Sequence, residues 1–278
     1  MGLPVSFLTH LQTKGYNSRN SAHSRAVCEA IVADLMANCA SVRSEALAGQ
    51  LVFKIDHVLP AAGLDEWKTD LAIGPPLPGF RPSPTHPPGA MPEATPIATR
   101  IAVEAKSTMT KHSGARKNRK RDLEAHHQHV HAYHEATIAA SVSLINAADV
   151  FHSSLLVEPT TITTRAMTAY AKAEGVVNQV KMVAFSPRVG VPGIDAKCAL
   201  VVEMDNINLA STRYVESHRR LRRRAIRSTG TLSFIVSASA TPSGFDSTPH
   251  LSGRSMDSRK VGSPPRDQRR CVRGLHRV

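Results

Sequence analysis

The sequence has no long hydrophobic run, and that shortage excludes a membrane-spanning protein. No stretch approaches the roughly 18 consecutive apolar residues that mark a membrane-crossing helix. The first residues also lack the apolar segment of a signal peptide. We therefore expect a protein that does not enter a membrane and works in the cytoplasm.

Cysteine is scarce and unpaired in sequence. The four cysteines, Cys28, Cys39, Cys198 and Cys271, lie far apart, and none forms a Cys-x-x-Cys pair. This spacing argues against a disulfide framework and against a zinc ribbon. A reducing cytosol fits this cysteine usage best.

Acidic residues are almost missing from the end of the chain, which explains most of the net charge of +13. From Arg219 to Val278 there are 14 Lys and Arg against 3 Asp and Glu, so this tail carries +11. Residues 1–218 are therefore nearly neutral, and the high charge alone does not show that they bind nucleic acid. The tail, 219–278, is rich in Ser, Arg, Pro and Gly and is predicted to be mostly disordered. It either strengthens DNA association non-specifically or is the out-of-frame end of a damaged gene.

Apolar periodicity alternates between helix and strand along residues 1–218 and predicts one α/β domain. A short helix or coil is expected before residue 20, and an amphipathic helix from Ser21 or Ser24 through Met36. Further helices are expected from the basic run near residue 111 to His134 and at 164–175. Strands are expected at 51–55, ending near Asp56 and His57, and at 67–74, 100–106, 138–148, 182–185 and 198–203. The first two are expected to pair antiparallel.

Proline dominates the segment between two of these strands. From Gly74 to Ala98 the sequence has nine prolines and three glycines, with Gly74 included. Proline has no N–H to donate to a ladder, so residues 75–98 predict a long exposed loop.

Two short apolar runs each carry one carboxylate. Asp70 lies in the run 67–74, and Glu104-Ala105-Lys106 ends the run that begins at Arg100. Residues two apart on a strand share a face, so Glu104 and Lys106 are expected to project together. With Asp70 on a neighbouring strand, this gives two carboxylates and one ammonium. Such a group suits Mg²⁺, which takes hard oxygen ligands and substrate phosphates, with the lysine acting on the attacking water.

Asp70 followed by Glu104-Ala105-Lys106 resembles the signature of the PD-(D/E)XK nuclease superfamily, which includes many restriction endonucleases. The match covers a few residues, and Thr69 stands where the signature has proline. The resemblance implies a restriction-endonuclease-like core with a central mixed sheet flanked by helices, and Mg²⁺-dependent cleavage of DNA. It assigns metal ligation to Asp70, Glu104 and the Ala105 carbonyl, and catalysis to Asp70, Glu104 and Lys106. Many members act as dimers, so a homodimer is a further expectation.

The same resemblance suggests one more metal ligand. A glutamate on an N-terminal helix often joins the metal site of this superfamily. Glu29, on the helix after Ser21, is the first candidate, and Glu45 is the second. The alternative for each is a solvated helical carboxylate.

A basic run follows the supposed metal site directly. It comprises Lys111, Arg116, Lys117, Arg119, Lys120 and Arg121. Lys111, Arg116, Lys117 and Arg119 are the candidates to hold backbone phosphates of DNA. The alternative is a solvated start of a helix.

Two rival sites stand beside this interpretation. His127, His131 and His134 share one helical face, where three imidazoles can bind zinc, although zinc ligands usually come from more than one element. Asp195-Ala196-Lys197 repeats the acid-x-lysine triplet before a strand but has only Asp149 as an upstream aspartate. The sequence thus predicts a Mg²⁺-dependent DNA endonuclease. The alternative is a basic nucleic-acid-binding protein that performs no chemistry.

Overall fold

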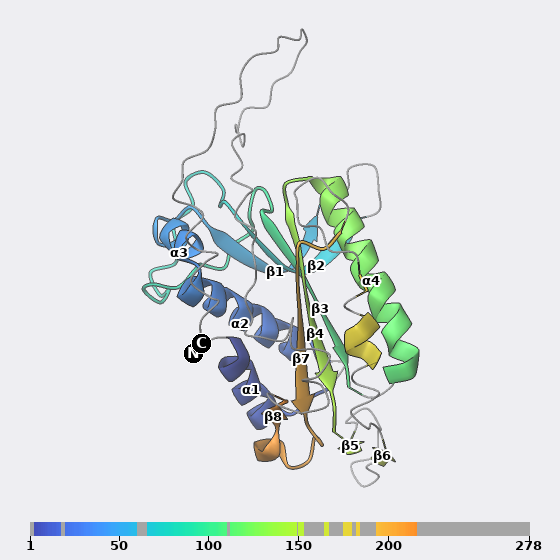
Figure 1. The fold of residues 1–278 in the computed structure, drawn as a ribbon. Coiled ribbons are helices and arrows are strands. Elements are labelled where there is room, and N and C mark those ends of the chain that lie inside the picture. The colour runs from blue at the N-terminus through green and yellow to red at the C-terminus, as the bar shows by residue number, and fades with distance from the viewer. Residues whose placement is uncertain are drawn as a thin grey trace.

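The sheet of this α/β protein has six strands in the order β1-β2-β3-β4-β7-β8. A computed structural model describes residues 3–17, 20–59, 66–109, 112–148, 150–152, 164–166, 175–179, 182–183 and 193–215. The sheet is mixed: β1, β2 and β3 are antiparallel, β3, β4 and β7 are parallel, and β8 is antiparallel to β7. A parallel step needs a crossover, and α4 supplies it between β3 and β4 (Figure 1).

The elements alternate as the apolar pattern predicts. The helices are α1 (Leu3–Lys14), α2 (Ala22–Asn38), α3 (Ala40–Leu47), α4 (His112–Tyr133) and the 3₁₀ turn η1 (Leu209–Ser211). The sheet strands are β1 (Val52–Leu59), β2 (Trp67–Gly74), β3 (Ile101–Thr108), β4 (Ile138–Asn146), β7 (Ala196–Glu203) and β8 (Arg213–Tyr214). A separate antiparallel pair comprises β5 (Val150–His152) and β6 (Thr164–Ala166).

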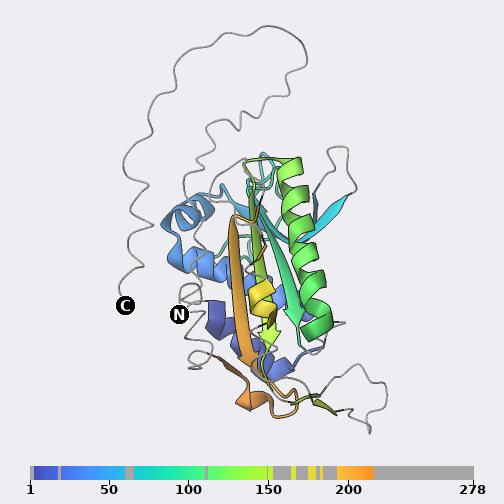
Figure 2. The same ribbon diagram turned by 45° about the vertical axis from the view of Figure 1, so that its right-hand side comes forward.

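Helices cover both faces of the sheet (Figures 1 and 2). On one face α1, α2 and α3 share a core with every second strand residue, such as Leu71, Val103 and Val142. On the other face α4 packs with Leu123 and Val130 against Ile145 and Ala139. Successive strand residues point to opposite faces, so β3 buries Val103 under α2 and turns Glu104 toward α4.

Several local predictions from the sequence are wrong. Strand β1 does not end near Asp56 but continues to Leu59, with Asp56 in a left-handed conformation at φ 57°. Residues 164–166 of the expected helix at 164–175 form a strand instead. The proline-rich segment is not simply an exposed loop, because Phe53 exchanges main-chain hydrogen bonds with Pro92 and Ala94, and Met91 is buried. This contact covers the free edge of β1, since an edge strand presents unpaired donors and acceptors.

Other predictions are confirmed or lie beyond the described residues. Strands at 67–74, 100–106, 138–148 and 198–203 and helices α2 and α4 all occur close to their expected bounds. Residues 184–185 of the expected strand at 182–185, Asp149, Lys111 and the basic tail lie outside the described residues. None of the described helices is long and apolar enough to span a membrane.

Candidate active site

Strand β2 leaves β3 in the middle of the sheet. The β2–β3 pairs run from Ile73↔Ile101 to Leu71↔Val103 and then stop. Beyond this point β2 stays paired with β1, through His57↔Thr69 to Leu59↔Trp67. The β1–β2 pairing skips Asp56 and Asp70, and the left-handed backbone of Asp56 lies at the skipped position. The edge of β3 is therefore open from Glu104 onward.

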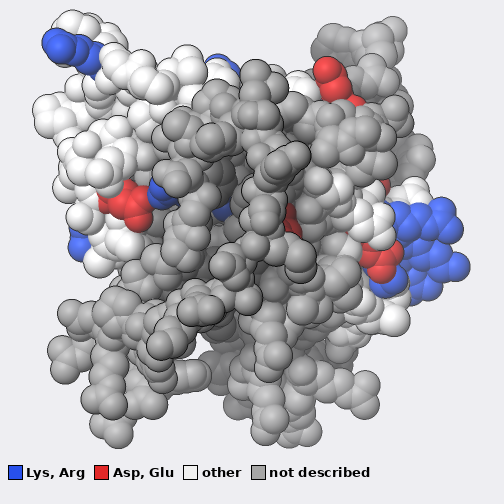
Figure 3. All heavy atoms as spheres, turned by 90° about the horizontal axis from the view of Figure 1, so that it is seen from above, with Lys and Arg blue, Asp and Glu red and all other residues white. Residues whose placement is uncertain are grey.

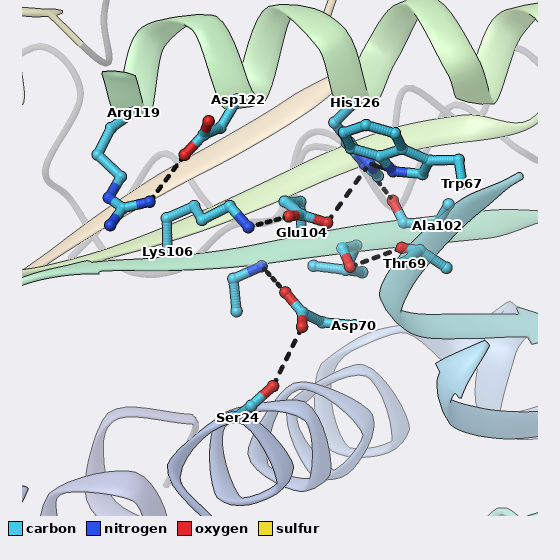
Figure 4. A network of polar contacts seen from close by, with 12 residues as sticks. Ser24, Trp67, Thr69, Asp70, Ala102, Glu104, Lys106, Arg119, Asp122 and His126 are labelled. Atoms are coloured by element: carbon cyan, nitrogen blue, oxygen red, sulfur yellow. Dashed lines mark hydrogen bonds and ion pairs between the residues drawn. The ribbon is translucent and has the colours of Figure 1, made fainter. Parts of the chain in front are cut away.

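Side chains take over the hydrogen bonds of the missing ladder. Asp70 Oδ2 accepts a hydrogen bond from the Ala105 N–H at 2.7 Å. Thr69 Oγ1 donates to the Val103 carbonyl at 2.8 Å. The Asp70 carboxylate thus lies at the open edge, beside the peptide bond that joins Glu104 to Ala105. Helix α2 fixes it from below, because Ser24 Oγ donates to Asp70 Oδ1 at 3.2 Å (Figure 4).

The carbonyl of Ala105 faces the same opening. A strand residue presents its N–H and C=O to the same neighbouring strand. Because the Ala105 N–H meets Asp70, the Ala105 carbonyl points toward the edge that β2 has left.

Glu104 and Lys106 project from one face of β3, as the sequence predicts. Their side chains form an ion pair on the side of β3 that α4 covers (Figure 4). The Glu104 side chain is only 5% exposed, whereas the Lys106 side chain is 26% exposed. Asp70 comes from the neighbouring strand β2, as the sequence predicts, but its side chain approaches β3 from the α2 side, opposite to Glu104 and Lys106. The departure of β2 explains this, since Asp70 turns to the unpaired N–H of Ala105.

Burial and a neighbouring charge change the acidity of Glu104. Desolvation and the charge of Asp70 together raise the pKa of Glu104 to about 7, although Lys106 acts to lower it. Glu104 Oε2 is buried and has no hydrogen-bond partner among the described residues. This carboxylate therefore lacks part of the positive charge and hydrogen bonding that would hold it ionised.

A buried histidine of α4 lies next to Glu104. His126 Nδ1 lies 3.8 Å from Glu104 Oε2, and its Nε2 lies 3.4 Å from the Ala102 carbonyl. Trp67 Nε1 donates to His126 Nδ1 at 3.3 Å. An indole only donates, so the His126 proton is on Nε2. Burial lowers the pKa of His126 to about 3, and the ring is neutral at pH 7.

The basic start of α4 runs along this site. Arg119 lies toward Lys106 and forms an ion pair with Asp122 at 2.7 Å (Figure 4). Arg116 and Lys117 are exposed. Seen from above, Lys and Arg side chains gather on the side of the molecule where Figure 1 places α4 (Figure 3). The structure thus places Arg119 at the site and leaves Arg116 and Lys117 free to meet a ligand from solvent.

The two glutamates suggested as extra ligands have other partners. Glu29 forms an ion pair with Arg25 at 3.1 Å, and half of its side chain is exposed. Glu45 forms an ion pair with Arg100 at 2.5 Å, at the start of β3. The contacts of the described residues join neither glutamate to Asp70 or Glu104.

The rival sites do not assemble a metal cluster. His131 Nε2 lies 3.0 Å from Asp195 Oδ2, and His134 Nδ1 accepts from the Ala136 N–H. Lys197 donates to the Val183 carbonyl at 2.9 Å. Within the described ranges, no group of three or more His, Cys, Asp or Glu side chains is placed to hold a metal ion. Asp70 and Glu104 are two carboxylates, so among the described residues they also fall short of a group of three.

Three contributors to the site were missed in the sequence. Ser24 was considered only as the possible start of a helix, and His126 and Asp122 were given no role. A usable signal existed, because Arg119, Asp122 and His126 recur at three and four positions along one helical face. Nothing in the sequence connects Ser24 with Asp70.

Comparison with known proteins adds no relative. No protein-family model, no curated protein and no solved structure matches the chain.

Proposed function

We propose that the protein is a Mg²⁺-dependent DNA endonuclease with a restriction-endonuclease-like core. The observation that carries this proposal is the opening between β2 and β3, where Asp70 accepts the Ala105 N–H from the α2 side and Glu104 is paired with Lys106 on the α4 side. The arrangement of three antiparallel strands, a crossover helix and a parallel strand supports the finer fold assignment.

The donor set suits magnesium. Mg²⁺ is commonly bound through one or two carboxylates, with waters and substrate phosphates completing its shell. Asp70, Glu104 and the Ala105 carbonyl supply oxygen only, and Glu104 Oε2 is buried without a partner among the described residues. When bound there, the ion supplies positive charge against the phosphate and lowers the pKa of a water.

Lys106 lies where it can act on the nucleophile. Its ammonium is paired with Glu104, and a quarter of its side chain is exposed. There it orients the attacking water and offsets the negative charge that grows on the phosphate. The water oxygen attacks phosphorus in line with the P–O bond that breaks. One end of the cut strand keeps the phosphate and the other gains a hydroxyl.

The basic residues of α4 position the DNA. Arg119, on α4, lies toward Lys106 of β3. Arg116 and Lys117 are exposed and lie about one helical turn earlier on α4. Guanidinium and ammonium groups contact phosphates independently of sequence. We assign these three residues to holding the backbone so that one phosphate reaches Lys106.

The test is cleavage of supercoiled plasmid by the full chain with and without Mg²⁺. Wild type is expected to nick or linearise the plasmid only with Mg²⁺, and Glu104→Gln and Lys106→Gln are expected to be inactive. Matched controls are Glu203→Gln, an ion-paired strand carboxylate on β7, and Lys68→Gln, an exposed lysine on β2. Cleavage that survives both site substitutions would refute the proposal.

A second candidate is a nucleic-acid-binding protein without chemistry, favoured by the exposed basic residues of α4. It predicts that DNA is retained without a metal ion and that Glu104→Gln changes nothing. Retention by wild type with no cleavage under any divalent metal would select it.

A further inference from the structure

Two serines of β4 lie beside the site on the neighbouring strand. Ser141 is the register partner of Glu104, and Ser143 is the register partner of Lys106. Paired residues of adjacent strands point to the same face, and such strands run about 4.8 Å apart. Both serines therefore face α4, next to the two charged side chains.

On the α4 face of β4, the serines occur only at the two positions that pair with charged residues of β3. Along the α4 face of β4 the residues are Ala139, Ser141, Ser143 and Ile145. The residues of the other face, Ala140, Val142 and Leu144, belong to the hydrophobic core under α2. Hydroxyls thus replace apolar side chains at the two levels where β3 carries Glu104 and Lys106.

These hydroxyls are buried and have free hydrogen-bonding capacity. Ser141 is 0% exposed and Ser143 is 3% exposed. Neither Oγ has a hydrogen-bond partner among the described residues, and the same holds for Glu104 Oε2. A buried hydroxyl without a partner is destabilising. An ionised carboxylate only accepts and a serine hydroxyl can donate, so Ser141 and Glu104 complement each other.

We propose that Ser141 and Ser143 are positioning residues for Glu104 and Lys106. Ser141 donates to Glu104 Oε2, directly or through one bridging water, and leaves a second lone pair for a metal ion. Ser143 accepts from the Lys106 ammonium and holds it toward the opening. This inference rests on the proposed nuclease function, and metal-binding carboxylates are generally oriented by such hydrogen bonds.

The Mg²⁺ dependence of plasmid cleavage separates the two roles. Ser141→Ala is expected to raise the half-saturating Mg²⁺ concentration by about tenfold or more and to keep most of the rate at saturating metal. Ser143→Ala is expected to lower the saturated rate and to leave the metal requirement within about twofold. The control is Thr212→Val, which removes another buried hydroxyl without a partner among the described residues, just before β8. A Ser141→Ala variant that behaves like Thr212→Val would overturn the proposal.

A double-mutant cycle on unfolding tests the same pairing without any activity. Ser141→Ala and Glu104→Ala are expected to be coupled by more than about twofold in the unfolding equilibrium constant, because residues that share a hydrogen bond are not additive. The cycle of Thr212→Val with Glu104→Ala is expected to be additive. A coupling factor of one for Ser141 would contradict its positioning role. Clear coupling together with a wild type that never cleaves would instead refute the nuclease function itself.

Discussion

Asp70 Oδ2 accepts a hydrogen bond from the main-chain N–H of Ala105, at a distance of 2.7 Å. The carboxylate of one strand thus takes the place of a ladder partner on the next strand, at the point where the two separate. This hydrogen bond holds the Asp70 side chain at Ala105, the residue directly after Glu104. The position of Asp70 in the site depends on this contact.

Asp70→Asn separates the charge of Asp70 from its structural role. The amide oxygen can still accept from the Ala105 N–H, so the free energy of unfolding is expected to change by less than about 1 kcal/mol. The lost negative charge is expected to abolish Mg²⁺-dependent cleavage. Asp70→Ala, which leaves the N–H without this acceptor, should cost about 1–3 kcal/mol of stability. Urea denaturation of both variants measures the difference, and equal destabilisation would contradict the assigned contact.

Glu104→Gln is expected to stabilise the protein above neutral pH while it removes activity. The pKa of Glu104 is raised to about 7 from an ordinary value of 4.5, so the folded state holds a proton that the unfolded state releases between these values. Wild-type stability from this group is therefore present below pH 4.5 and is lost as pH rises through 7. The variant should gain on wild type by as much as about 3 kcal/mol at pH 8. Urea denaturation of both proteins at pH 5 and pH 8 measures this gain, and a variant less stable than wild type at pH 8 would exclude it.

His126→Gln is expected to act in the opposite direction. Burial lowers the pKa of His126 to about 3, so the unfolded state binds a proton below pH 6.5 that the folded state refuses. Stability from the neutral ring is present above 6.5 and is lost as pH falls. Between pH 7 and pH 5, the free energy of unfolding of the variant should fall by about 2 kcal/mol less than that of wild type. Thermal unfolding from pH 5 to 7 tests this, and an equal acid dependence of the two proteins would contradict a buried neutral His126.

Part of this site can be predicted from the sequence, and part of it cannot. The pairing of Glu104 with Lys106 follows from strand alternation alone, and the alternation of strands and helices predicts the α/β fold. The approach of Asp70 from the α2 side does not follow, because it depends on where β2 leaves β3 and on the left-handed Asp56. The histidine-rich end of α4 looks polar in sequence, yet His126 is fully buried between Trp67 and Ala102. A local pattern does not show which side of a helix faces a polar row of the sheet.

Removal of positive charge from the start of α4 should weaken DNA binding in a salt-dependent way. Arg116→Ala and Lys117→Ala are each expected to reduce the slope of log affinity against log salt by about one unit. The control is Arg213→Ala, an exposed arginine on β8 that pairs with Glu203. Fluorescence anisotropy with a labelled duplex at several salt concentrations measures the slopes. Slopes equal to those of the control would remove α4 from the DNA-binding surface.

The central claim is that Asp70 and Glu104 hold a single divalent ion. Electron paramagnetic resonance with Mn²⁺, used as a stand-in for Mg²⁺, counts bound ions on the full chain without any DNA. The account predicts an ion that wild type binds and that both Asp70→Asn and Glu104→Gln lose, while Glu203→Gln keeps it. Mn²⁺ binding that is unchanged in either site variant would contradict the account.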